Sequence, residues 1–116
     1  MPDGCVEKHQ LAGLDDRERG FSRVVEIEQA EGRCRAVLRY ETTLVTTDGY
    51  ETRTQALAEL ISLLQTRGFR QLRSQLSFRE NAYFGSRESW IEYPDSEHAR
   101  SSGGVISRFI NWLRSG

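Results

Sequence analysis

Residues 52–68, TRTQALAELISLLQTRG, decide the fold because they carry the signals of one amphipathic helix. Thr52, followed three residues later by Gln55, is typical of a capping box, in which side chains bind the first free backbone N–H groups. Arg67 and Gly68 supply a cation for the last turn and a residue suited to the left-handed helix end. Between these ends an apolar stripe recurs at helical spacing: Ala56, Leu57, Leu60, Ile61, Leu63 and Leu64.

Two segments that precede the helix alternate apolar and polar residues, as half-buried strands do. They are residues 21–28, FSRVVEIE, and residues 34–45, CRAVLRYETTLV, separated by turn-forming residues around Gly32. The second segment is expected to be one strand with these residues on its core face: Ala36, Leu38, Tyr40, Thr42 and Leu44. The hairpin register that keeps both apolar faces together predicts these partners: Ile27 with Ala36, Val25 with Leu38, and Glu28 with Arg35.

A second hairpin is predicted after the helix. Residues 69–78, FRQLRSQLSF, alternate with these residues on one face: Leu72, Ser74, Leu76 and Phe78. Residues 79–82 suit a short hairpin loop, and residues 83–93, YFGSRESWIEY, form the fourth strand. Gly85 suggests a β-bulge there, because strict alternation along this strand would place Arg87 on the core face.

The expected fold is a two-layer α+β domain in the order β-β-α-β-β-α, with helices packed on one face of a four-stranded, mostly antiparallel sheet. Residues 1–19 have few large apolar side chains and are predicted to form a mobile tail. Residues 20–93 form the core domain and residues 94–104 a linker. Residues 105–114, VISRFINWLR, are expected to form an amphipathic helix with one broad apolar side: Val105, Ile106, Phe109, Ile110, Trp112 and Leu113.

Composition sets limits on the function. The chain has 116 residues, 28% of them charged, and a net charge of −1 that gives no general attraction to nucleic acid or to an anionic membrane. There is no long apolar run and no export signal, so we expect a cytoplasmic protein without a transmembrane segment or membrane-surface contact. All but one of the basic residues are Arg, a bias that fits ion pairing, phosphate binding or simply a GC-rich genome.

The chain lacks a recognisable set of catalytic or metal-binding residues. Cys5 and His9 stand four residues apart, but a stable zinc site needs three or four ligands. His9 and His98 fall in the predicted tail and linker, and Cys34 has no partner at a characteristic spacing. We therefore expect no catalytic residue, no cofactor, no metal and no enzymatic activity.

The remaining candidates for function are surface side chains. The predicted interaction surface joins arginines and aromatic residues that suit protein interfaces: Arg35, Arg39, Arg73, Phe84, Trp90, Phe109 and Trp112. A module that binds protein, or a second copy of itself as a homodimer, ranks first. A sheet that binds single-stranded nucleic acid through the Arg and aromatic residues ranks second. An enzyme or enzyme subunit ranks third.

Overall fold

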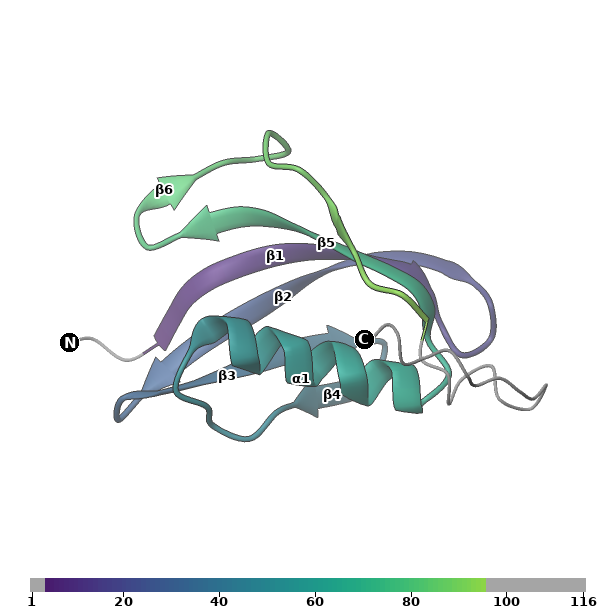
Figure 1. Cartoon of the computed structure of the whole chain (residues 1–116), viewed down its shortest axis with the longest axis horizontal. Helices are drawn as coiled ribbons and strands as arrows, with labels where there is room; N and C mark the ends of the chain where they lie inside the picture. The colour runs from purple at the N-terminus through teal and green to yellow at the C-terminus, as the bar shows by residue number, and fades with distance from the viewer. Residues whose placement is uncertain (1–3, 96–116) are drawn as a thin grey trace.

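The computed structural model describes residues 4–95, which form one antiparallel sheet with a single helix on one side (Figure 1). The sheet has seven strands in the order β4-β3-β2-β1-β5-β6, and β7 also pairs with β5. The elements are β1 (Gly4–Leu14), β2 (Gly20–Ala30), β3 (Arg33–Tyr40), β4 (Thr43–Thr46), α1 (Arg53–Thr66), β5 (Arg70–Arg79), β6 (Ala82–Tyr83) and β7 (Ile91–Glu92). The expected β-β-α-β-β-α order with a four-stranded sheet is therefore wrong, and the described chain is mostly β.

The largest error concerns the N-terminal residues. Gly4–Leu14, which lie in the predicted mobile tail of residues 1–19, form β1, with β2 on one side and β5 on the other. The side chains that β1 buries include Leu11, but also the polar Glu7 and His9. These polar residues give β1 little hydrophobic signal in the sequence, although it joins the two halves of the sheet.

The helix agrees with the prediction. Thr52 is the N-cap of α1, the reciprocal bonds with Gln55 complete the capping box, and Arg67 is the C-cap. The helix packs over β3 and β2 and buries five residues of the predicted stripe: Ala56, Leu57, Leu60, Ile61 and Leu64. On the sheet these residues meet a core that includes Val25, Ile27, Ala36, Leu38 and Leu72.

The β2–β3 hairpin has the predicted register, with Ile27 opposite Ala36 and Val25 opposite Leu38. The single strand expected over residues 34–45 is wrong, because the chain turns at residues 41 and 42. Glu41 has a φ of 56°, a value that few residues other than glycine adopt. After this turn β4 runs back along β3, so Leu44 pairs with Arg39 rather than lying on the core face.

The strand after the helix also changes face. The pairing of β1 with β5 shifts between Lys8 and His9, so Ser77 is an extra residue and Phe78 moves to the side opposite Leu76. The continuous fourth strand expected over residues 83–93 is wrong as well. Only the two short strands β6 and β7 form there, and a loop joins them.

Two sequence predictions concern membranes and the C-terminal region. Within residues 4–95, no helix has the length and apolar character needed to cross a membrane. The predicted linker, residues 94–104, extends beyond the last described residue, Asp95, and the predicted helix of residues 105–114 lies wholly outside the described residues.

Candidate functional site

The side of the sheet opposite α1, called here the outer face, carries no helix among the described residues (Figure 1). Its members follow from the register, because partners in neighbouring antiparallel strands point to the same side. One row crosses six strands and contains Tyr83, Phe78, Lys8, Glu26, Val37 and Thr46. The outer face is therefore a continuous surface contributed by strands from both ends of the described chain.

Large apolar side chains are exposed on this face. Tyr83 is 73% exposed, Val24 45% and Trp90 40%. Cations lie against two of the rings, with Lys8 Nζ 5.7 Å from the centre of the Phe78 ring and the Arg73 guanidinium 5.0 Å from that of Trp90. Exposed aromatic residues near arginine are typical of surfaces that bind other proteins.

A hollow of about 530 Å³ opens beside Tyr83 on the outer face. Its lining combines strand residues with residues of the loop after β6: Lys8, Gln10, Val24, Gln75, Ser77, Phe78, Tyr83, Gly85 and Ser86. The loop is fastened to β5, because Gln75 Nε2 donates to the carbonyl oxygens of Ser86 (3.1 Å) and Glu88 (2.7 Å). These bonds hold the loop in place and so maintain the shape of the hollow.

The charges of the outer face are interleaved rather than segregated. Arg35 and Glu28 form an ion pair of 2.9 Å, and Glu26 is the cross-strand partner of Lys8. Arg73 is likewise opposite Glu92. Opposite charges at neighbouring positions cancel much of each other's field, so this face is not a basic patch.

The structure places the predicted interaction residues as follows. Arg35, Arg39 and Arg73 lie on the outer face, and Trp90 contacts Arg73 there. Phe84 is half-buried in the loop after β6 and does not line the hollow. Phe109 and Trp112 lie outside the described residues. The exposed Tyr83 is not among the residues predicted from the sequence, and neither is the hollow beside it.

A second polar cluster lies on the helix side of the sheet, centred on Glu7, which is 5% exposed. Glu7 Oε1 is hydrogen-bonded to His9 Nε2 (2.9 Å), and Oε2 accepts from Arg79 Nε (3.0 Å) and Arg53 (3.3 Å). Burial opposes the charge on Glu7, but the bonds from these three partners lower its pKa from 4.5 to about 2. The cluster ties β1 to β5 and α1. Its chemistry is that of a structural ion-pair network.

Asp15 forms another buried polar site, in the turn between β1 and β2. Its carboxylate accepts hydrogen bonds from the backbone N–H groups of Arg17 and Arg19, from Arg19 Nε and from the Tyr40 hydroxyl. Burial would raise the pKa of Asp15, yet these hydrogen bonds hold it well below its ordinary value. Three of these donors belong to the turn and the fourth, Tyr40, to β3. Asp15 therefore stabilises the turn and fixes it to β3.

Neither a cluster of metal-binding side chains among the described residues nor a similar protein points to a function for these surfaces. Among residues 4–95, no three His, Cys, Asp or Glu side chains lie together in a way that could hold a metal ion. Comparisons of the chain with protein-family models, curated proteins and solved structures gave no match.

Proposed function

We propose that the protein is a binding module without catalytic activity, and that its outer face binds a second copy of the same chain. One observation carries this proposal: the same face presents an exposed ring, Tyr83, and a hollow of about 530 Å³ beside it. In a two-fold symmetric dimer each copy uses the same patch, so that patch must be complementary to itself, and a projection beside a recess of matching size meets this requirement. Tyr83 and the hollow are such a pair.

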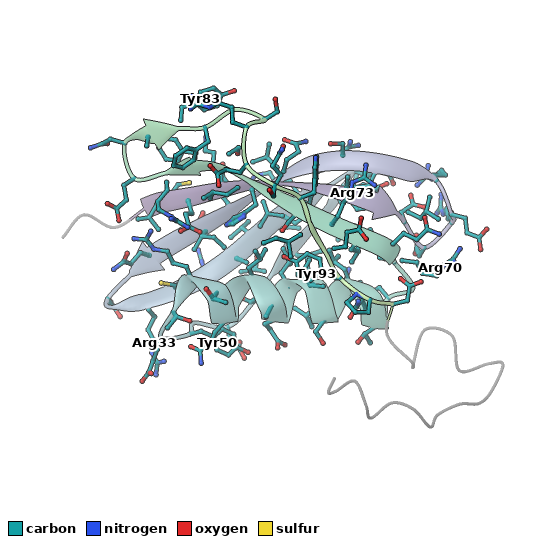
Figure 2. The ribbon with its side chains drawn as sticks, turned by 45° about the horizontal axis from the view of Figure 1, so that its top comes forward. Arg33, Tyr50, Arg70, Arg73, Tyr83 and Tyr93 are labelled. Carbon is teal, nitrogen blue, oxygen red and sulfur yellow. The ribbon has the colours of Figure 1, made fainter. Side chains whose placement is uncertain are left out.

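The apolar lining of the hollow supports an aromatic guest. Val24 and Phe78 contribute to its wall, and Gln10 and Ser77 offer polar groups to a tyrosine hydroxyl. Burying an aromatic side chain in such a recess is the kind of contact that dominates binding energy in protein interfaces. Tyr83 projects at the β6 end of the sheet, across the molecule from Arg33 and Tyr50 (Figure 2).

The interleaved charges favour a protein partner over nucleic acid. A nucleic-acid surface needs a field of one sign to neutralise phosphates, whereas here Glu26, Glu28 and Glu92 stand beside the basic residues. A surface of mixed charge can instead pair with a rotated copy of itself. The single-stranded nucleic-acid reading remains the alternative, since Arg73 and Trp90 together resemble a stacking platform.

Measurement of molar mass by light scattering over a wide range of concentrations tests the proposal. The full chain should approach twice its 13.3 kDa mass as the concentration rises. Tyr83→Ser should stay monomeric over the same range. The matched control is Ala82→Ser, because Ala82 is the exposed neighbour of Tyr83 in β6 but points to the other side of the sheet. A chain that is monomeric throughout, or a Tyr83→Ser variant that dimerises normally, overturns the proposal.

A separate binding experiment tests the nucleic-acid alternative. We expect no change in fluorescence anisotropy when a labelled mixed-sequence single-stranded oligonucleotide is titrated with the protein at moderate salt. A complex that weakens steeply with salt, and that is lost in Arg39→Glu, would replace the dimer with a nucleic-acid interface.

A further inference from the structure

One helix covers only part of the sheet. The helix α1 packs over β3 and β2, whereas β1 and β5 continue the sheet beyond it (Figure 1). The short strand β7 pairs with β5. Between α1 and β7 the helix side of the sheet has a groove of about 560 Å³. This groove is on the opposite side of the sheet from the outer face, so a ligand in the groove would leave the surface of the proposed dimer free.

The groove has apolar walls and a polar end. Leu57 and Ala58 of α1 form one wall, Leu76 lies on the floor, and Ile91 and Tyr93 form the other wall. Ile91 is 58% exposed although it faces this groove. The polar end holds Glu7 with its partners Arg53 and Arg79. Exposed apolar walls of this kind are stabilised when another apolar group covers them.

The chain itself supplies a suitable occupant. Residues 105–114 lie outside the described residues, and their sequence has the apolar stripe named above, with Phe109 and Trp112 among its members. A helix of this length does not persist alone in water, so its stripe needs a partner surface.

The last described residue fixes where this segment starts. Gln65 Nε2 donates to the carbonyl oxygen of Pro94 (2.8 Å), and Asp95 Oδ1 accepts from the backbone N–H of Gln71 (2.7 Å). The chain is thus anchored where α1 ends and β5 begins. Residues 96–104 can span at most about 30 Å, and α1, with 14 residues, is about 21 Å long. The linker can therefore reach any part of the groove.

We propose that residues 105–114 bind as an amphipathic helix in the groove between α1 and β7 of their own chain, with Phe109 and Trp112 against Leu57, Leu76 and Ile91. The single described helix would then be the first of two on that side of the sheet. The helix-side core, which already includes Leu11 of β1 and Leu72 of β5, would extend further to Leu76 and Ile91, and the outer face would remain open.

Tryptophan fluorescence of the full chain tests this. In a Trp90→Phe background Trp112 is the only tryptophan, because the chain has two. Its emission should be shifted to the blue and protected from acrylamide, and dilution should not change it. Ile91→Asp should shift the emission to the red and raise quenching several-fold. Leu44→Asp is the matched control, since Leu44 is 54% exposed but lies on the outer face, and it should have no effect.

Three other fluorescence results would contradict the proposal. Fully quenched, red-shifted emission in the parent would mean that the segment is not bound. Protected emission that is unaffected by Ile91→Asp would place it on another surface, and protection lost on dilution would mean binding between copies. Unfolding by Ile91→Asp would appear in far-UV circular dichroism. In that event truncation after Ser102 decides, because the proposal requires it to lower the midpoint of urea unfolding.

Discussion

Glu7 and Arg79, which are 72 positions apart in the sequence, meet across neighbouring strands, and Arg79 Nε donates to Glu7 Oε2 at 3.0 Å. This ion pair connects the first strand of the chain to the strand that follows the helix. The Glu7 carboxylate is almost completely buried, so it depends on its partners for the hydrogen bonds that water would otherwise supply. The stability of the central strand should therefore depend on these partners.

Replacing Glu7 with Gln should lower the free energy of unfolding by about 1–3 kcal/mol, because the neutral amide no longer matches the arginines at a buried site. The loss of stability should be smaller than for breaking a fully buried ion pair, because Arg53 and Arg79 are partly exposed. Urea denaturation measures the change. Glu80→Gln removes a carboxylate that binds the same Arg53 but is 65% exposed, and it should change stability by less than about 0.5 kcal/mol. Equal effects of the two variants would contradict the structural role of Glu7.

The free energy of unfolding should also depend on pH through the Glu7 carboxylate. The pKa of Glu7 is lowered from 4.5 to about 2 in the folded protein, so the unfolded chain binds the proton first as the pH falls. The contribution of Glu7 is thus complete above its unfolded pKa and is lost as the pH decreases toward about 2. Urea midpoints measured from neutral pH downward should fall for the parent and fall less steeply for Glu7→Gln. Asp15, whose pKa is also lowered, acts in both proteins, so parallel curves would contradict the assignment to Glu7.

The helix–sheet core gives a prediction that rests on packing alone. Leu60 is completely buried against the sheet, and Leu60→Ala should lower the free energy of unfolding by about 2–5 kcal/mol through lost burial and a cavity. Ser62→Ala on the exposed side of α1 is the control. A change below about 0.5 kcal/mol for Leu60→Ala would show that the helix does not bury this side.

Gly13 tests the close approach of β1 to β5. A Cβ atom at this position would lie 2.9 Å from the carbonyl oxygens of Arg70 and Gln71, which is closer than van der Waals contact allows. Gly13→Ala should therefore destabilise the protein by about 1–3 kcal/mol, as measured by urea unfolding. At Gly20 an added Cβ meets nothing within 4 Å, so Gly20→Ala should be nearly neutral. Similar effects at the two sites would contradict the β1–β5 pairing.

The elements predicted correctly from the sequence are those whose signals are local. The helix from Thr52 to Arg67 and the pairing of Ile27 with Ala36 follow from capping and from alternation, which involve neighbouring residues or a single hairpin. The strand β1 was missed because two of its buried positions hold Glu7 and His9. The burial of Glu7 is stabilised by Arg53 and Arg79, residues far along the chain, and no local pattern reveals such partners.

Of the outer face, only the residues that local alternation directs outward could be predicted from the sequence. Alternation in the strands placed Arg35 and Arg73 away from the core, and both lie on the outer face. The position of Tyr83 beside the hollow could not be predicted from the sequence, because its surroundings depend on the extra residue Ser77 and on a loop that Gln75 holds through backbone carbonyls. These contacts join segments whose proximity becomes apparent only once the sheet has formed.

Backbone amide NMR of the full chain, recorded during serial dilution, tests the outer-face dimer most directly. We predict that the concentration-dependent shifts cluster on strands around the hollow, at Lys8, Val24, Phe78 and Tyr83, and that Leu60 in α1 does not shift. In Tyr83→Ser, the amide signals of Lys8, Val24 and Phe78 should no longer shift with concentration. Spectra that do not change with concentration, or shifts confined to α1 and the groove beside it, would contradict the assignment of the outer face as the binding surface.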